Sequence, residues 1–168
     1  MARQPRSALP AQGTYHVTNR GVEQRDIYLD DIDRRSFLSL LRLSTRRFRW
    51  SVDAYTLMTN HFHLVVTANL DRLSDGMHLL GFRYAQAFNE RHARIGHLFQ
   101  GRFGAKVVDE ETYFFDVCAY VFDNPVRSRI CERAGDYPWS GGDYFPLFRG
   151  SSENAGSPSI EAAFFSRT

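Results

Sequence analysis

Two adjacent strand-like segments in the middle of the chain restrict its possible folds more than any other feature. Residues 50–58 show the every-second-residue pattern of a strand, and residues 61–67, HFHLVVT, are dense in strand-forming side chains. Only Thr59 and Asn60 separate the two segments, and a connection this short joins antiparallel strands. The centre of the chain is therefore predicted to be a β-hairpin within an antiparallel sheet.

Long amphipathic helices are predicted before and after this hairpin. The first begins at Asp30 or Asp31, whose carboxylate can cap a helix, and runs to about Phe48. The second runs from Leu70 to about His92 and carries apolar side chains at helical spacing. Each helix has an apolar side that must be buried, so helices are expected to cover the sheet.

The remaining predicted elements lie toward the two ends of the chain. Residues 14–19 and 102–108 are strand candidates, and Asp109 can cap a last helix that is expected to end near Asn124. The reason for that end is Pro125, which disfavours helical backbone at the residue before it. The resulting order, β-α-β-β-α-β-α, predicts an α+β, ferredoxin-like (split βαβ) fold with an extra C-terminal helix.

The length of 168 residues suits one domain. We expect that domain to span residues 1–149, with its core at about 14–144, and residues 150–168 to form a flexible tail. No apolar run is long enough to span a membrane, and the N-terminus lacks the apolar stretch of a signal peptide. Cys118 and Cys131 form no CxxC pair, which excludes a zinc ribbon. A cytoplasmic protein without membrane association is expected.

The charge pattern is compatible with nucleic-acid binding but does not establish it. The net charge of +2 is modest, and Lys106 is the only lysine in the chain. Arginine suits phosphates and base edges, although a genome rich in G and C produces the same bias. The chain has no Walker-type loop, GxGxxG or GxSxG motif, so nucleotide hydrolysis, dinucleotide binding and serine-hydrolase chemistry lack support.

His61 and His63 are candidate metal ligands. Side chains two residues apart on a strand point to the same face, so both imidazoles are expected to leave the sheet together. Two neutral imidazoles on one face can bind a divalent metal. The alternative is a pair of half-buried histidines with ordinary hydrogen-bond partners.

Tyr120 and Asn124 are four residues apart and share one face of the last predicted helix. The Asn124 carbonyl is a hard oxygen ligand suited to Mg²⁺ or Mn²⁺, and a tyrosine one turn away can attack a metal-polarised phosphodiester. The alternatives are a helix C-cap for Asn124 and a core aromatic for Tyr120.

Further polar residues are candidates for contacts with DNA. Arg20, Arg102 and Arg127 lie at the ends of predicted elements, Arg83 lies on the long helix, and Gln100 lies in a loop where a base can stack or pair. For each residue alone, a solvated side chain is the alternative.

A resemblance to a known family rests on five stretches in a fixed order. They are YHVTNRG (15–21), MTNHFHLV (58–65), GHLFQGRF (96–103), YVFDNPVR (120–127) and YPWS (137–140). Over about residues 14–144, the chain resembles the single-tyrosine HUH transposases of bacterial insertion sequences, the IS200-like type. Within them it is most similar to the REP-associated tyrosine transposases.

The resemblance implies a ferredoxin-like nuclease fold with Mg²⁺ or Mn²⁺ as cofactor. It implies that His61 and His63 are the paired histidines of the family, that Tyr120 is the nucleophile and that Asn124 is the third ligand. Such enzymes nick single-stranded DNA near a hairpin, form a 5′-phosphotyrosine with a free 3′-OH, and need no ATP. The REP-associated branch acts on short palindromic repeats.

Two departures and several open points accompany the resemblance. Phe62 stands between the two histidines. Asn124 stands where the mobile branch often has glutamine, and this second departure favours the REP-associated branch. The expected function is single-stranded DNA nicking and strand transfer by a bacterial, nucleoid-associated transposase. A rolling-circle-type nicking endonuclease and a non-catalytic hairpin-binding module are the alternatives, and the choice between monomer and homodimer stays open.

Overall fold

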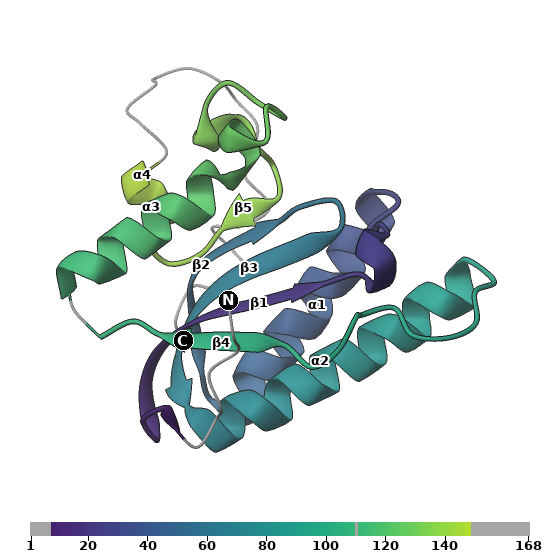
Figure 1. Cartoon of the computed structure of the whole chain (residues 1–168), viewed down its shortest axis with the longest axis horizontal. Helices are drawn as coiled ribbons and strands as arrows, with labels where there is room; N and C mark the ends of the chain where they lie inside the picture. The colour runs from purple at the N-terminus through teal and green to yellow at the C-terminus, as the bar shows by residue number, and fades with distance from the viewer. Residues whose placement is uncertain (1–7, 110, 149–168) are drawn as a thin grey trace.

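Figure 1 shows the computed structural model, which describes residues 8–109 and 111–148. In chain order the elements are β1 (Gln12–Arg20), η2 (Val22–Gln24), α1 (Asp31–Phe48), β2 (Ser51–Leu57), β3 (His61–Asn69), α2 (Leu70–Arg91), β4 (Gly104–Val107), α3 (Glu111–Arg127), η3 (Ala134–Asp136), β5 (Ser140–Gly141) and α4 (Phe145–Phe148). The predicted order of strands and long helices is confirmed. The short elements η2, η3, β5 and α4 were not predicted.

The strands form one five-stranded antiparallel sheet in the order β4-β1-β3-β2-β5. The predicted hairpin of β2 and β3 is present, and β1 lies between β3 and β4. The first four strands thus have the arrangement of the split βαβ fold, which confirms the predicted ferredoxin-like class. Because β1 and β3 are neighbours, residues from the start and the middle of the chain meet across them.

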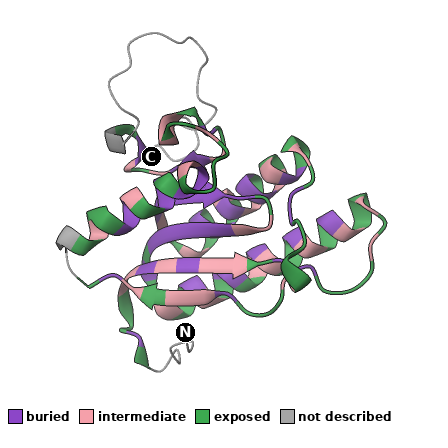
Figure 2. Cartoon of the chain, turned by 45° about the horizontal axis from the view of Figure 1, so that its top comes forward, coloured by how far each residue is buried: buried purple, intermediate pink, exposed green. Residues whose placement is uncertain are grey.

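Helices cover both faces of the sheet, with α1 and α2 on one side and α3 on the other (Figure 1). Phe62 and Leu64 of β3 enter the core shared with α1 and α2, whereas Val65 packs with Val121 of α3. Strands β2 and β3 are therefore mostly buried, as Figure 2 shows. Burial on both faces explains why the sequence of β3 is so rich in apolar residues.

The start of α1 is fixed as the sequence predicts. The Asp30 carboxylate accepts hydrogen bonds from the backbone N–H groups of Ile32 and Asp33, at 2.9 and 3.1 Å. Asp33, which is 2% exposed, accepts a hydrogen bond from Arg91 at 2.7 Å and lies 3.0 Å from the Nε2 atom of His92. These contacts join the first turn of α1 to the end of α2.

Helix α3 differs from the prediction at its C-terminal end, because it runs through Pro125 to Arg127 instead of ending near Asn124. Proline removes one backbone hydrogen bond, but a bond across it remains: the Ser128 N–H donates to the Asn124 carbonyl at 3.0 Å. The prediction was wrong because losing one bond interrupts this helix without ending it. Asn124 therefore lies inside the helix and is not its C-cap.

The predicted last strand is shorter than expected, since β4 begins at Gly104 and the two residues before it belong to the preceding loop. The predicted tail, residues 150–168, lies outside the described residues. Within the described residues, no helix combines the length and apolar character needed to cross a membrane.

Candidate active site

His61 and His63 lie at the start of β3, on the face that α3 covers. Side chains alternate along the strand, so both rings leave this face while Phe62 enters the opposite core. The two ring centroids are 5.1 Å apart, and the planes meet at 79°. His63 is buried and His61 is half-buried. The imidazoles lie side by side, as the strand alternation predicts.

A third histidine, His16 of β1, belongs to the same cluster, and the sequence analysis missed it. Its Nε2 atom lies 2.9 Å from Nδ1 of His63, and the two rings stack with centroids 5.2 Å apart. From the sequence, strand alternation predicts that His16 and Thr18 lie on the same face of β1. In the structure, Thr18 pairs with His63. The register between β1 and β3 was still needed to bring His16 to His63, and no local sequence pattern encodes that register.

Hydrogen bonds determine which imidazole nitrogens have a lone pair available to a metal. The Oδ1 atom of Asn60 lies 2.7 Å from Nδ1 of His61; an amide oxygen only accepts, so Nδ1 carries the proton and Nε2 has a lone pair. Between His16 and His63, one ring donates and the other accepts. When Nδ1 of His63 is the donor, its Nε2 atom has a lone pair for a metal.

The histidine rings are neutral near pH 7. Burial lowers the pKa of His16 to about 4, with a further contribution from the charge of Lys106. Burial and the nearby charge of Arg20 lower the pKa of His61 to about 4. Burial, the neighbouring His16 and His61 rings and Arg20 lower the pKa of His63 to about 3. Neutral imidazole is the form that binds metals, so this environment suits ligation.

Tyr120 of α3 lies over the histidine cluster. Its ring meets the rings of His63 and His16 edge-on, with centroid distances of 5.7 and 6.0 Å. On the same helix, the Arg127 guanidinium lies 5.3 Å from the Tyr120 ring centroid. Tyr120 is 40% exposed, so it is not a core aromatic. The ring is held by its neighbours while the side chain stays accessible to a substrate.

Asn124 lies one turn after Tyr120 and is 9% exposed. Its Nδ2 atom donates to the Tyr120 carbonyl at 2.7 Å, which leaves Oδ1 as the acceptor. Within residues 8–109 and 111–148, no group of three His, Cys, Asp or Glu side chains is arranged to hold a metal ion. A metal bound by His61 and His63 thus needs a donor of another type, and the Asn124 amide oxygen is chemically suitable for Mg²⁺ or Mn²⁺.

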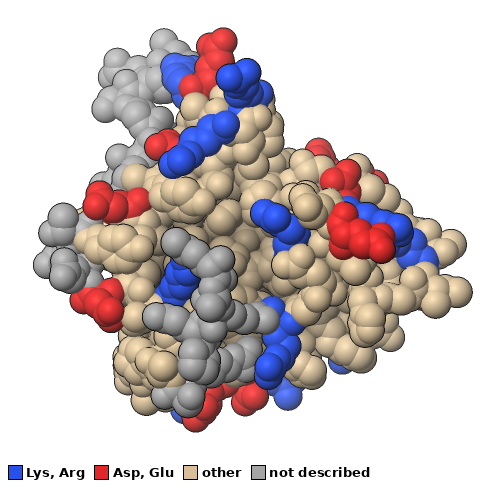
Figure 3. Space-filling model, in the orientation of Figure 1, with Lys and Arg blue, Asp and Glu red and all other residues tan. Residues whose placement is uncertain are grey.

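Two of the candidate DNA-binding arginines lie near this cluster. Arg20, at the end of β1, pairs with His61 across the strands, and its charge acts on both His61 and His63. Arg127 stacks on Tyr120. Figure 3 shows Lys and Arg groups in the middle of the face that carries β1 and β4, with most acidic groups toward its rim.

The other candidates lie elsewhere. Gln100 and Arg102 are in the loop beside the end of β1, where the Gln100 N–H donates to the Arg20 carbonyl at 3.0 Å. Arg83 is exposed on α2, which covers the opposite face of the sheet. The fold therefore gathers Tyr120 and the paired histidines with two arginines, but it does not bring Arg83 to them.

A solved structure supports this architecture. The described fold is similar to a solved structure of a REP-associated tyrosine transposase bound to a REP hairpin, with a TM-score of 0.71 and 16% identity, covering 100% of this chain and 99% of that one. A Deinococcus radiodurans R1 protein provisionally assigned as a transposase gives a TM-score of 0.48 at 16% identity, covering 72% of this chain and 95% of that one. No curated protein matches the chain significantly.

The sequence itself matches a family model. The model describes IS200-like transposases and matches residues 11–124, which include β1, the histidine pair and Tyr120. This match spans more than half of the chain, and the similarity in fold extends over its whole length. The chain belongs to the IS200-like transposase family.

Proposed function

We propose that this transposase cuts single-stranded DNA with Tyr120 and joins the cut end to another DNA strand. The observation that supports the proposal is the position of Tyr120, whose accessible ring packs edge-on against His63 and His16. A phenol held beside potential metal ligands is suited to attack a phosphodiester. A tyrosine buried in the core would contribute only to packing.

The proposed reaction conserves the number of phosphate ester bonds. The phenolic oxygen of Tyr120 attacks phosphorus and forms a 5′-phosphotyrosine, its proton passing to solvent. The bond from phosphorus to the 3′-oxygen breaks, and that oxygen takes up a proton to become a free 3′-OH. A second 3′-OH then attacks the phosphotyrosine, which releases the phenol and restores a phosphodiester. No external energy source is required, because each step exchanges one phosphate ester for another.

His61, His63 and Asn124 would hold Mg²⁺ or Mn²⁺ in this proposal. Such an ion acts as a Lewis acid that polarises the phosphodiester and offsets charge in the transition state. The neutral imidazoles support the assignment because their lone pairs are not occupied by protons. The Asn60 contact to His61 and the His16 contact to His63 orient the two rings.

We propose hairpin-forming, palindromic repeat DNA as the substrate. The protein of similar fold in complex with a REP hairpin supports this choice. Arg20 and Arg127 lie beside the cluster and suit phosphates that flank the reacting one.

The test is formation of a covalent adduct. The full-length protein is mixed with Mn²⁺ and a labelled hairpin oligonucleotide with single-stranded flanks, taken from repeats near its gene, and resolved on a denaturing gel. Wild type is expected to give a labelled adduct that disappears with EDTA and in Tyr120→Phe. The matched control is Tyr113→Phe, an exposed tyrosine on the same helix, which should retain the adduct.

The alternatives predict different outcomes of the same assay. A non-catalytic binding module would bind the hairpin but form no adduct in wild type, and Tyr120→Phe would change nothing. A rolling-circle-type nicking endonuclease would form the adduct but fail to transfer the bound strand to a second hairpin end. Loss of the adduct in Tyr120→Phe with transfer in wild type supports the transposase reaction.

A further inference from the structure

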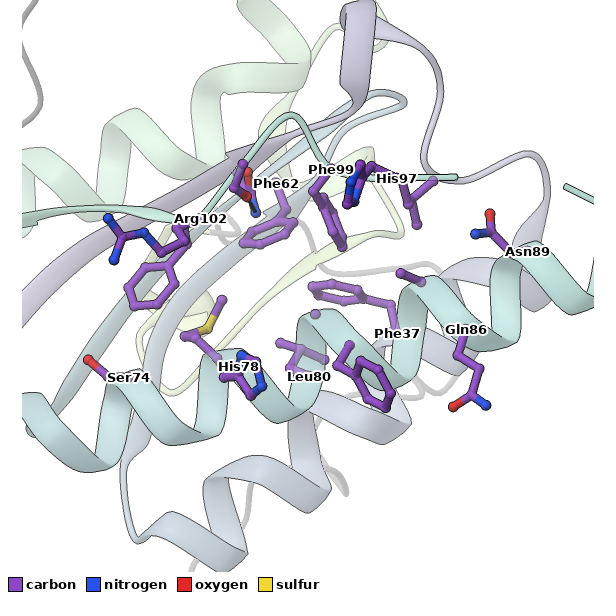
Figure 4. A pocket seen from close by; sticks show the side chains of 18 of the residues that line it. Phe37, Phe62, Ser74, His78, Leu80, Gln86, Asn89, His97, Phe99 and Arg102 are labelled. Carbon is purple, nitrogen blue, oxygen red and sulfur yellow. Dashed lines mark hydrogen bonds between the residues drawn. The ribbon is translucent and has the colours of Figure 1, made fainter. Parts of the chain in front are cut away.

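A pocket lies between α2 and the loop of residues 96–103, on the face of the sheet opposite the histidine cluster (Figure 4). Its volume is about 740 Å³, within the range of sites that hold small organic ligands. Neither Tyr120 nor any of the three clustered histidines lines it. The pocket is thus separate from the candidate active site.

The walls of the pocket are aromatic. Phe62 and Phe99 point from β3 and from the loop toward α2 (Figure 4), and their rings meet edge-on with centroids 6.2 Å apart. Phe103 closes a further side, and Phe82 of α2 is 61% exposed where it lines the pocket. A planar ligand with apolar faces fits such walls, and a nucleobase is one because every base has a π-face.

The polar groups of the pocket suit a nucleotide. Ser74 and His78 of α2 line it with hydrogen-bonding atoms, and Arg102 lies at its edge with the guanidinium directed outward (Figure 4). None of the described residues that line it is Asp or Glu. A phosphate at this edge therefore lies near a cation, whereas a cationic ligand finds no carboxylate among the described lining residues.

The pocket and the candidate active site lie next to the same strand ends, the end of β1 and the start of β3. Phe62 lines the pocket, while His61 and His63 on either side of it lie on the other face, where His63 contacts Tyr120. The Asn19 amide of β1, which also lines the pocket, donates to the Gly101 carbonyl at 3.2 Å. The pocket therefore opens just behind the strand ends that carry Arg20 and His61.

The loop of residues 96–103 is hydrogen-bonded to the same end of β1. Gly21 forms a β-bridge with Phe99, and the Gln100 N–H donates to the Arg20 carbonyl at 3.0 Å. A single strand of DNA that left the active site past Arg20 would reach Arg102 and the pocket around the end of β1. An unpaired nucleotide close to the cut site is the occupant that this path favours.

We infer that the pocket between α2 and residues 96–103 binds one unpaired nucleotide of the DNA strand that Tyr120 cuts, with the base stacked on Phe99 and Phe82. The inference rests on the proposed function and adds a second contact that positions the strand. The pocket fixes the distance along the strand between the bound base and the cut phosphate.

An abasic scan tests this inference. Each flanking nucleotide of the hairpin oligonucleotide is replaced in turn by an abasic site, and the dissociation constant is measured by fluorescence anisotropy without divalent metal. Base–aromatic stacking contributes roughly 1–3 kcal/mol per base, so wild type should lose about 5- to 150-fold in affinity at one flank position. Phe82→Ala and Phe99→Leu should bind the intact oligonucleotide more weakly and lose most of the sensitivity at that position. Leu43→Ala removes an exposed apolar side chain of α1 and should behave as wild type.

The outcomes separate this inference from the proposed function. Equal sensitivity to the abasic site in wild type and both pocket variants, or no sensitive position at all, would overturn the pocket assignment. If Tyr120-dependent adducts still form in that case, the nicking proposal stands alone. A sensitive position that disappears in both pocket variants supports the pocket even if no adduct forms. Phe99→Leu keeps an apolar side chain against Phe62, so a folded variant is available if truncation proves disruptive.

Discussion

At the scale of single residues, the arrangement of nitrogen atoms in the histidine cluster governs the proposed chemistry. His61 is oriented by Asn60 within its own turn, whereas His63 is oriented by His16 from another strand. The two potential ligands thus depend on hydrogen bonds of different origin. Removing His16 should leave His63 in place on β3 but free its ring to rotate.

His16→Ala is expected to weaken Mn²⁺ binding about 10- to 100-fold, the usual effect of losing a residue that orients a metal-binding histidine. Isothermal titration calorimetry and the electron paramagnetic resonance spectrum of bound Mn²⁺ measure this without any DNA. His16→Gln keeps a hydrogen-bonding group and should recover part of the affinity. The control is His78→Ala, which removes an exposed histidine of α2. Unchanged affinity in His16→Ala would show that His63 does not need this contact.

The lowered pKa values predict a dependence of folding stability on pH. His16, His61 and His63 have folded pKa values of about 4, 4 and 3, below the value of about 6.5 for an unfolded chain. The unfolded state therefore binds more protons between these limits, and the free energy of unfolding should fall as the pH drops from 6.5 toward 4.

Urea denaturation of the metal-free protein at several pH values measures this slope. Near pH 5 unfolding should take up about three protons from the cluster, and His16→Gln should reduce the uptake by about one. A free energy of unfolding that stays flat over this pH range would contradict the neutral, buried state of the cluster.

At the scale of elements, Gly76 of α2 packs closely against Trp50, the residue before β2. Among the glycines of the described helices, Gly76 leaves the least room for a side chain. A Cβ atom at Gly76 would lie 2.6 Å from Nε1 of Trp50, whereas the nearest atom to a Cβ at Gly81 is 4.0 Å away. Both glycines lie within α2. They therefore form a matched pair that separates packing from helix propensity.

Gly76→Ala is expected to destabilise the protein by about 1–3 kcal/mol, because Trp50 must move in a packed core. Gly81→Ala should instead stabilise it by about 0.5–1 kcal/mol, the usual gain from replacing glycine inside a helix. Chemical denaturation of both variants measures the difference. A stabilised Gly76→Ala variant would show that Trp50 is loosely packed.

The elements also show what the sequence could predict. The long helices and the central hairpin have strong local patterns, and the structure places them within a few residues of their predicted limits. The two-residue β5 has no such pattern, because it forms only by pairing Ser140 and Gly141 with β2. The same limit applies to His16: its residue type was visible, but its contact with His63 depends on how β1 is inserted next to β3.

At the scale of the whole molecule, the sheet separates the two kinds of DNA contact that we propose. The face under α3 carries the histidines next to Tyr120, and the opposite face, toward α2, carries the aromatic pocket. Arg127 lies on α3 beside Tyr120, and Arg83 lies on α2. The position of each arginine in the fold therefore predicts its share in DNA binding.

The salt dependence of hairpin binding tests that division. In a Tyr120→Phe background, which keeps binding reversible, Arg127→Ala should reduce the slope of log affinity against log salt concentration by about 0.7–0.9, the value of one lost phosphate contact. Arg83→Ala should leave the slope unchanged. Equal reductions in both variants would show that Arg83 also contacts a phosphate and would contradict this division.

The central claim is that Tyr120 becomes linked to DNA, and peptide mass spectrometry of the adduct tests it most directly. Trypsin cleavage at Lys106 and Arg127 gives a peptide that contains both Tyr113 and Tyr120, and its fragmentation shows which one carries the added mass. After nuclease digestion, we predict a nucleotide joined through its 5′-phosphate to Tyr120. A nucleotide on Tyr113 or another residue, or a linkage through a 3′-phosphate, would contradict the proposed reaction.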